Sequence, residues 1–256
     1  MSDVVTARDG AVLTITLNRP EVLNALSGPL QLQLRDALDE AAAPEIRSVV
    51  LTGSGKAFCA GQDLRDFEEL SGTVAEALEE LYHPNVRRIR ALRKPVICAL
   101  NGVAAGAGLS LAMACDLRVA AESASLVPGF VGIGLVPDAG GTWFLARELG
   151  FARAFEWLGS NRRLPASEAL TWGLVGGVIP DAEFMARVAE LATEWAARPT
   201  TAIGATKALL EEATAGALEA QLAREASAQA AMIATHDFAE GVAAFLAKRP
   251  AVYKGA

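Results

Sequence analysis

The stretch PVICALNGVAAGAGLSLAMAC, Pro95 to Cys115, carries no charged side chain and decides the fold. It is long enough to cross a bilayer, which takes roughly 20 residues. Asn101-Gly102 interrupts it with a turn signal, however, and Gly106 and Gly108 follow among alanines. Asp116 comes next, with no aromatic belt. We therefore expect no membrane span, but a buried strand before the turn and a short buried helix after the glycines.

Strands and helices alternate on both sides of this stretch. Short runs rich in β-branched residues predict strands, and apolar residues at helical spacing predict helices. The expected strands are Val12–Leu17, Arg47–Thr52, Pro95–Leu100 and Leu117–Ala121, and the expected helices are Leu30–Ala43, Val74–Leu92, Leu109–Cys115 and Trp143–Leu149. This order predicts an α/β fold.

The strands end near Asp181, and alanine-rich helical segments follow. These segments are Ala182–Trp195, Thr200–Ala215, Leu218–Thr235 and Asp237–Leu246. The composition shifts near Arg198-Pro199. The sequence therefore predicts a core over 1–197 and a helical region over 198–256, which could serve assembly or plain packing.

The overall composition excludes several classes of protein. The chain has 256 residues, of which 52% are hydrophobic and 21% charged, so it is neither disordered nor collagen-like. A net charge of −7 makes nucleic acid a poor partner, although a small phosphorylated ligand could still bind at a local cluster. Three cysteines in apolar contexts indicate buried thiols in a reducing compartment. The N-terminus lacks the pattern of a signal peptide, so a cytoplasmic location is expected.

Few of the common catalytic motifs are present. His83 and His236 are the two histidines, and no Cys-x-x-Cys pair occurs, so a zinc site is not expected. The chain also lacks a Gly-x-Ser-x-Gly elbow, a Walker loop and a dinucleotide fingerprint. Metal and nucleotide cofactors are therefore not predicted.

Two glycine-rich turns stand out instead. The first runs from Ala57 to Leu64 after a buried strand, and Asp63 could cap a helix that follows. The second runs from Gly102 to Gly108. Backbone amides at two such turns can converge on one oxygen atom as an oxyanion hole. Two ordinary turns remain the alternative.

A third segment, Gly132 to Thr142, places Asp138 among apolar and glycine residues. The side chain could be the N-cap of the following helix. Alternatively, it could be a carboxylate with a raised pKa that acts as a base. Spacing alone leaves both readings open.

Taken together, these segments resemble the crotonase superfamily, the enoyl-CoA hydratase/isomerase family. The resemblance covers nearly the whole chain in order. The matching segments are Leu17–Pro20, Asn24–Leu26, Val50–Gly53, Ala57–Leu64, Lys94–Val96, Asn101–Gly108, Leu111–Asp116, Gly134–Thr142, Ala166–Ala169, Trp172–Val175, Glu240–Phe245 and Lys248–Pro250.

The resemblance implies a crotonase fold, a spiral of ββα units with a C-terminal helical trimerisation region. It also implies a homotrimer or a dimer of trimers and a coenzyme A thioester as substrate, with no separate cofactor. Two backbone N–H groups then hold the thioester oxygen as an enolate, and they map to Gln62 and Ala107. Such donors are worth about 3–4 kcal/mol each.

The acid and base positions depart from the hydratase pattern. Hydratases of the family use two glutamates, at positions that correspond to Ser110 and Phe130. Asp138 instead matches the aspartate of family isomerases. The segments 130–143 and 82–90 are similar to the phenylacetate-pathway isomerases, which move a double bond or isomerise an epoxide-derived oxepin thioester. The resemblance therefore implies an isomerase in which Asp138 shuttles the proton.

Three other functions remain open. One is an enoyl-CoA hydratase. Another is an acyl-CoA hydrolase or dehalogenase with Asp138 as nucleophile and His83 as the base that activates water. The last is a crotonase-fold protein that binds without catalysis, although the acidic balance disfavours nucleic acid.

The resemblance also implies a set of substrate-binding residues. The backbone around Val22, Ala25, Ala60 and Leu64 is expected to line the pantetheine and adenine. Phe245 and Lys248 would approach the nucleotide of a neighbouring subunit. The remaining expected substrate contacts are Asp63, Ser110, Phe130 and His83.

Overall fold

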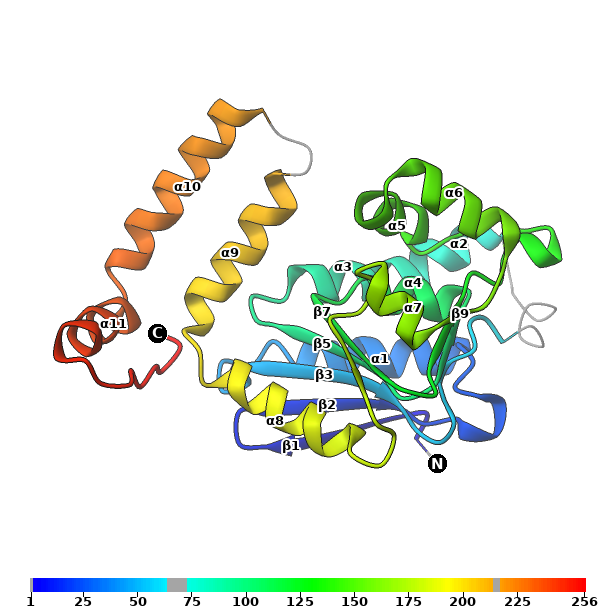
Figure 1. Ribbon diagram of the computed structural model, residues 1–256, viewed down its shortest axis with the longest axis horizontal. Coiled ribbons are helices and arrows are strands. Elements are labelled where there is room, and N and C mark those ends of the chain that lie inside the picture. Colours follow the sequence, from blue (N-terminus) through cyan, green and yellow to red (C-terminus); the bar gives the residue numbers. More distant parts are fainter. Residues whose placement is uncertain (1, 64–72, 214–216) are drawn as a thin grey trace.

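A six-stranded sheet forms the floor of the molecule in the computed structural model, which describes residues 2–63, 73–213 and 217–256. Its strands are β1 (Val4–Asp9), β2 (Val12–Leu17), β3 (Ser48–Gly53), β5 (Val96–Leu100), β7 (Leu117–Ala121) and β10 (Gly177–Ile179), in the spatial order β1-β2-β3-β5-β7-β10 (Figure 1). Neighbouring strands are parallel except for β1 and β2. The predicted strands Val12–Leu17 and Leu117–Ala121 are confirmed with their bounds.

A second sheet of very short strands was not predicted. It consists of β4 (Ala57–Cys59), β6 (Val103–Ala105), β8 (Ser125–Val127) and β9 (Leu164–Pro165), in that order. β4, β6 and β8 are parallel, and β9 pairs antiparallel to β8. Three residues are too few to show an alternating pattern, so the sequence indicated only glycine-rich turns here.

The chain winds through the two sheets in a repeated order. β3, β5 and β7 lie in the first sheet, and each is followed by β4, β6 or β8 in the second sheet and then by a helix. The expected spiral of ββα units is therefore confirmed. The helices of this part are α1 (Gly28–Glu40), α2 (Val74–Ala77), α3 (His83–Ala91), α4 (Ala107–Met113), α5 (Gly141–Leu149), α6 (Phe151–Ser160), α7 (Ala166–Thr171) and α8 (Phe184–Ala196). Short 3-10 helices lie at Pro20–Val22 and Val131–Ile133.

The helix predicted over Val74–Leu92 is interrupted. One π-helical turn, Leu78–Tyr82, lies between α2 and α3. Such turns often lie at functional sites. Here it changes which side chains of the helix face inward, and the periodicity of an ordinary helix does not reveal that change.

The uncharged stretch from Pro95 to Cys115 lies at the centre of the core. Every residue of β5 and α4 is buried. Among the described residues, no helix is both long and apolar enough to cross a membrane.

The C-terminal helices α9 (Thr200–Ala213), α10 (Leu218–Ile233) and α11 (His236–Ala247) stand to one side of the sheets (Figure 1). Lys207 of α9 ties them to the core, because its ammonium group lies 2.8 Å from Asp116 and donates to the carbonyl of Ile89. By contrast, no residue of α10 is buried. The limit between residues 197 and 198 remains a prediction.

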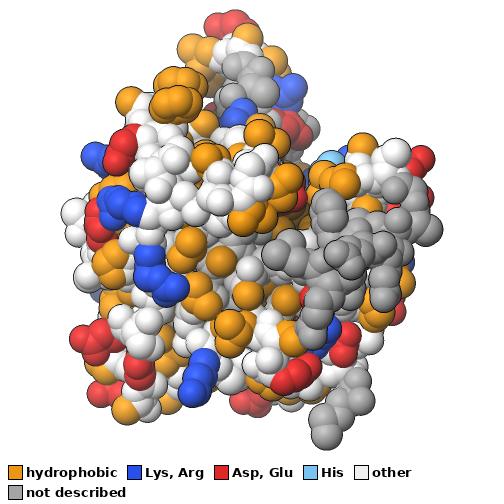
Figure 2. Space-filling model, turned by 90° about the vertical axis from the view of Figure 1, so that its right-hand side faces the viewer, with side chains coloured by type: hydrophobic (Ala, Val, Ile, Leu, Met, Phe, Trp, Pro, Cys, Tyr) orange, Lys and Arg blue, Asp and Glu red, His pale blue; other side chains and the backbone are white. Residues whose placement is uncertain are grey.

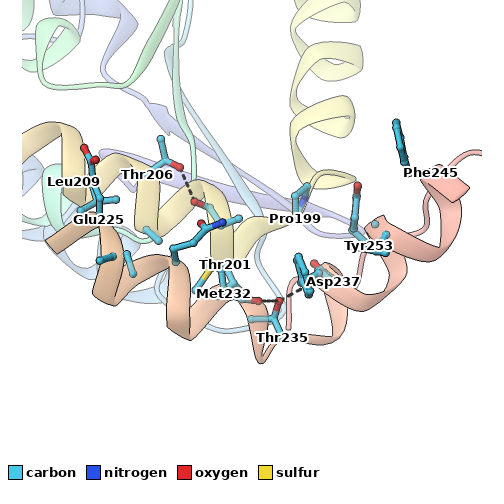
Figure 3. Close-up of a pocket in the computed structure, with 18 of the residues that line it drawn as sticks. Pro199, Thr201, Thr206, Leu209, Glu225, Met232, Thr235, Asp237, Phe245 and Tyr253 are labelled. Carbon is cyan, nitrogen blue, oxygen red and sulfur yellow. Dashed lines mark hydrogen bonds between the residues drawn. The ribbon is translucent and has the colours of Figure 1, made fainter. Parts of the chain in front are cut away.

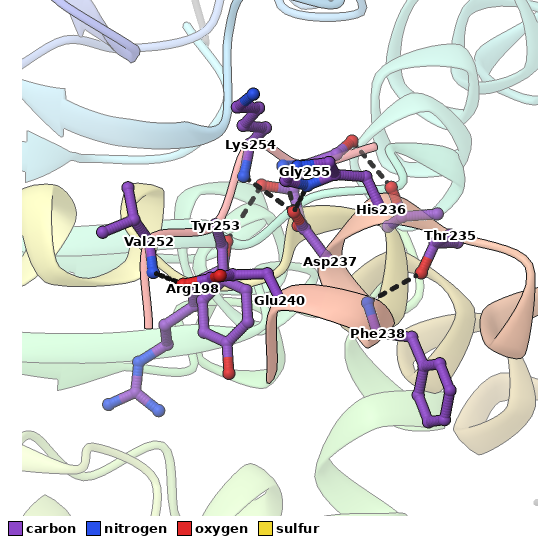
Figure 4. Close-up of polar contacts among 12 residues, drawn as sticks. Arg198, Thr235, His236, Asp237, Phe238, Glu240, Val252, Tyr253, Lys254 and Gly255 are labelled. Atoms are coloured by element: carbon purple, nitrogen blue, oxygen red, sulfur yellow. Dashed lines mark hydrogen bonds and ion pairs between the residues drawn. The ribbon is translucent and has the colours of Figure 1, made fainter. Parts of the chain in front are cut away.

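A groove of about 930 Å³ lies between α9, α10 and α11 (Figure 3). Phe245 lies at one end of it with 83% of its surface exposed. The C-terminal tail is held against α11, where the carboxylate of Asp237 accepts the backbone amides of Lys254 and Gly255 at 2.7 Å (Figure 4). The tail is thus fixed by hydrogen bonds to α11, and the groove beside it remains open.

Candidate active site

A cavity of about 370 Å³ opens where β4 and β6 end. It is lined by Gly28, Ala60, Gln62, Val74, Ala77, Leu78, Leu81, Tyr82, Ala107, Gly129, Phe130, Ile133, Leu135, Val136 and Asp138. All three segments singled out in the sequence therefore reach one cavity. Asp138 is the single carboxylate among the described residues of its wall.

The two glycine-rich turns meet because β4 and β6 are parallel neighbours, so their carboxyl ends lie at the same edge of the sheet. The approach is very close at Gly61. A methyl group there would lie 2.9 Å from the carbonyl oxygen of Ala105 and 3.5 Å from the amide nitrogen of Ala107. Gly61 also has a φ of +96°, which favours glycine.

The hydrogen bonds around Gln62 direct its amide away from Leu26. Leu26 donates to the carbonyl of Gly61 and accepts from the amide of Asp63, in an isolated parallel bridge with Gln62. In such a bridge the middle residue directs its own N–H to the opposite side. The Gln62 amide is therefore available to the cavity that Gln62 lines.

The second amide belongs to a helix N-terminus. Ala107 is the first residue of α4, and amides in the first turn of a helix have no acceptor within it. Because Gln62 and Ala107 line the same cavity, the arrangement allows both amides to bind one oxygen atom.

The turn at residues 18–26 supports these loops. Arg19 places its guanidinium 3.0 Å from the Asp63 carboxylate and also donates to the carbonyl of Ala25. The Asn24 side chain, fully buried, donates to the carbonyls of Ser54 and Ala57. Asp63 does not line the cavity. Its buried carboxylate instead holds the first turn against the loop of Arg19.

The N-cap reading of Asp138 is wrong. The N-cap of α5 is Gly140, and no side chain makes a capping hydrogen bond there. The Oδ1 atom of Asp138 is buried and has no hydrogen-bond partner among the described residues. Burial raises the pKa of Asp138 to about 6, and the nearby charge of His83 opposes part of that rise. A carboxyl with this pKa is suited to taking up and returning a proton near neutral pH.

The two positions at which hydratases carry glutamate have different surroundings. Phe130 lines the cavity beside Asp138. Ser110 is buried in α4 and does not line it, because its hydroxyl lies against Gly141, where an added methyl group would come within 2.6 Å. Neither position provides a second carboxylate.

His83 lies on the other side of Asp138. Its Nδ1 atom is 3.1 Å from Glu79, which also pairs with Arg87 at 3.0 Å. His83 lines a separate cavity of about 460 Å³ together with Ala139 and Gly140. It therefore influences Asp138 by its charge and does not share the cavity wall with it.

The other expected substrate contacts are dispersed. Ala60 lines the cavity, Ala25 is buried beside Arg19, and Val22 is half-buried in a 3-10 helix. Leu64 lies outside the described residues. Phe245 and Lys248 belong to the C-terminal helices and are exposed.

Sequence reasoning missed the wall contributed by residues 74–82, which supplies Val74, Ala77, Leu78, Leu81 and Tyr82. The apolar wall also continues outward, where Ile133, Leu135 and Val136 are exposed. Figure 2 views the side of the molecule that carries α5 and α6, and apolar side chains gather in the middle of that face.

Comparison with known proteins gives a consistent result. A family model described as "Enoyl-CoA hydratase/isomerase" matches residues 7–256. A probable enoyl-CoA hydratase of Rhodobacter capsulatus is 43% identical, over 94% of this chain and 93% of its own length. The 1,2-epoxyphenylacetyl-CoA isomerase of Escherichia coli is 40% identical, over 100% of this chain and 99% of its own length. A crystal structure of an enoyl-CoA hydratase from Bacillus anthracis is 35% identical and superposes with a TM-score of 0.94, over 99% of this chain and 100% of its own.

Proposed function

The chain belongs to the enoyl-CoA hydratase/isomerase family, and from this premise we propose that it is an acyl-CoA isomerase with Asp138 as its proton shuttle. The observation that carries the proposal is the composition of the cavity wall. Asp138 lines the same largely apolar cavity as Gln62 and Ala107, and no other carboxylate is found among the described lining residues. One carboxylate suffices to move a proton between two carbons.

The reaction needs no bound water. The Asp138 carboxylate takes a proton from the carbon between the thioester and the double bond, and the electron pair of that C–H bond moves into a dienolate. The amides of Gln62 and Ala107 hold the thioester oxygen as its negative charge grows, which lowers the barrier by about 3–4 kcal/mol per donor. The protonated Asp138 then returns the proton to the γ carbon, and the double bond shifts into conjugation.

The site is less suited to hydration, the addition of water across the double bond. Addition of water requires one group to activate the water and another to handle the α proton. Ser110 and Phe130 stand at the two positions that would supply these carboxylates, and the Phe130 ring occupies the wall beside Asp138. The family members named hydratases show that the fold supports hydration, so this activity is the first alternative.

The substrate has an apolar acyl group and a coenzyme A carrier. Leu78, Leu81 and Ile133 offer hydrocarbon contacts to the acyl group. The backbone near Val22, Ala25 and Ala60 would line the pantetheine and adenine. An epoxide or oxepin thioester from phenylacetate is one specific possibility, supported by the similarity to the isomerase from Escherichia coli.

A homotrimer, or a dimer of trimers, is part of the same proposal. It is supported by the exposed apolar residues of the C-terminal helices, of which Phe245 is the most exposed, and by the absence of buried residues in α10. In such an assembly Phe245 and Lys248 would approach the nucleotide held by a neighbouring subunit.

The direct test is product analysis in D₂O with 3-hexenoyl-CoA and 2-hexenoyl-CoA. We expect 3-hexenoyl-CoA to be converted to 2-hexenoyl-CoA, with deuterium at the α and γ carbons, because the proton on Asp138 exchanges with solvent. Mass spectrometry and NMR measure both results. If 3-hydroxyhexanoyl-CoA is the main product from 2-hexenoyl-CoA, the protein is a hydratase and the proposal fails.

The hydrolase reading requires His83, which lies close enough to influence Asp138. For an isomerase, we expect His83→Ala to lower kcat by less than about 10-fold, because the histidine is not on the cavity wall. Loss of its positive charge should move the pKa of Asp138 further up. Kinetics with 3-hexenoyl-CoA across pH measure both effects, and His236→Ala on the distant α11 is the matched control. A loss above about 100-fold for His83→Ala alone would favour a histidine-assisted hydrolysis.

A further inference from the structure

Cys59 is a fully buried thiol at the end of β4, directly before the turn that carries Gln62. It does not line the cavity, so it does not touch substrate. Burial raises the pKa of this thiol to about 12, so its sulfur is uncharged at neutral pH and is not a nucleophile. Its position between the two turns calls for another explanation.

The sulfur of Cys59 contacts both turns. On one side, the backbone N–H of Gly61 donates to Sγ at 3.4 Å. On the other side, Cys59 lies against Gly108, where an added methyl group would come within 2.7 Å of both Sγ and Cβ, and within 2.5 Å of the carbonyl oxygen of Cys59. Gly61 and Gly108 are the chain neighbours of Gln62 and Ala107. One side chain therefore spans the residues adjacent to the two candidate donors.

We propose that Cys59 is a positioning residue that sets the separation of the Gln62 and Ala107 amides. The inference rests on the proposed function, because it concerns the same oxyanion site. Its hydrogen bond from the Gly61 amide orients the Ala60–Gly61 peptide plane, which is one plane before the plane that carries the Gln62 amide. Its bulk fixes how closely the N-terminal turn of α4 approaches β4.

The effect of a small displacement should be large. Oxyanion donors act when they lie about 2.7–3.1 Å from the oxygen that becomes charged. A donor that is displaced by about 1 Å from this position can lower the reaction rate by about 100-fold. The β4–β6 ladder is irregular beside Cys59, where its register shifts between Ala57 and Cys59, and the Leu26–Gln62 bridge involves only the first turn. A side chain that contacts both turns adds a constraint between them.

The test compares Cys59→Ala, Cys59→Val and Cys59→Ser with Cys98→Ala. Alanine removes both the acceptor and the bulk, valine keeps an apolar bulk without an acceptor, and serine keeps an acceptor. Cys98 is an equally buried thiol on β5 in the other sheet, so Cys98→Ala controls for a cavity in the core. Each variant is measured for kcat, KM, thermal unfolding and the absorption maximum of bound cinnamoyl-CoA. The absorption maximum of this conjugated thioester moves to longer wavelength, a red shift, when its carbonyl oxygen accepts hydrogen bonds.

We expect Cys59→Ala and Cys59→Val to lower kcat by about 10–100-fold with KM changed by less than about 3-fold, and to reduce the red shift. Cys59→Ser should keep most of the wild-type kcat and of the red shift. Cys98→Ala should be less stable than the wild type but should keep its kcat and its red shift. If Cys59→Ala does not fold, Cys59→Val gives the answer. An unchanged red shift and kcat in a folded Cys59→Ala or Cys59→Val protein would overturn the inference, as would an equal loss in Cys98→Ala.

The red shift is read without turnover, which separates two kinds of failure. A wild-type protein that shifts the spectrum but does not isomerise would contradict the proposed function and leave the positioning role of Cys59 testable. A wild-type protein that binds cinnamoyl-CoA without a red shift would contradict the oxyanion site, and with it the role of Cys59.

Discussion

Asp138→Asn is expected to lower kcat for the conversion of 3-hexenoyl-CoA by about 10²–10⁴-fold, the usual contribution of a general base. The amide is nearly the same size as the carboxyl but cannot take a proton. KM should change little, because the Gln62 and Ala107 amides and the apolar wall are unaltered. Steady-state kinetics and deuterium exchange at the α carbon measure the loss. An exchange rate equal to that of the wild type would show that another group carries the proton.

The pH dependence of the same variant provides its control. In the wild type, kcat/KM should rise as the pH rises through about 6, because the base is the ionised form and burial raises the pKa of Asp138 to that value. Asp138→Asn should remove this limb from its residual activity. A limb that persists near pH 6 in the variant would assign it to a different group.

Asp138→Asn should also alter stability in a predictable direction. In the unfolded chain the carboxyl has a pKa of about 3.9. Between that value and about 6 the folded state holds a proton that the unfolded state has lost, so stability falls as the pH rises through this window. The full shift corresponds to about 3 kcal/mol, and because the carboxyl is only partly buried we expect a gain of about 1 kcal/mol for Asp138→Asn at pH 7.5. At pH 3.5 the gain should vanish, which denaturation at both pH values would measure.

Gly108→Ala is expected to lower kcat by about 10²–10³-fold, the cost of losing an oxyanion donor. The added methyl group would lie 2.5 Å from the carbonyl oxygen of Cys59, a contact that backbone atoms can relieve only by moving apart. The two turns must then separate, and the Ala107 amide moves with its helix. A loss of stability of about 1–3 kcal/mol should accompany the overpacking. Kinetics, thermal unfolding and the red shift of bound cinnamoyl-CoA measure these effects.

Gly159→Ala is the matched control for this substitution. Gly159 lies within α6, and nothing comes within 4 Å of a methyl group placed there. Alanine in a helix is favoured over glycine by up to about 1 kcal/mol, so the control should be at least as stable as the wild type and fully active. A folded Gly108→Ala protein with wild-type kcat would show that the spacing of the turns is not critical.

The strands β2, β3, β5 and β7 of the first sheet could be predicted because they are mostly apolar and buried or half-buried, whereas β1 is largely exposed and β10 has three residues. The predicted bounds of β2 and β7 are those observed. β4, β6 and β8 have three residues each, and no periodicity can be read from three residues. They form strands because the parallel ladder pairs them with each other, which is a tertiary effect.

The candidate site was partly predictable for similar reasons. Family motifs point to Gln62, Ala107 and Asp138, and the structure places all three on one cavity. Local sequence could not decide between a cap and a base for Asp138, because the start of α5 depends on the backbone at Gly140. The wall from Leu78 to Tyr82 was not predicted, because a π-helical turn changes the helical phase by one residue. The roles of Cys59 and of the Arg19–Asp63 pair depend on contacts between distant segments.

In the proposed mechanism the donors to the thioester oxygen are backbone amides, and residues behind the cavity wall position them. The proposed proton-handling group is a side chain on a different segment, after η4 (Val131–Ile133) and before α5. A substitution at the proposed proton-handling position, Asp138, would therefore leave intact the part of the site that is proposed to stabilise the enolate. This independence of two halves of one active site explains how a single scaffold can give rise to hydratases and isomerases through few substitutions.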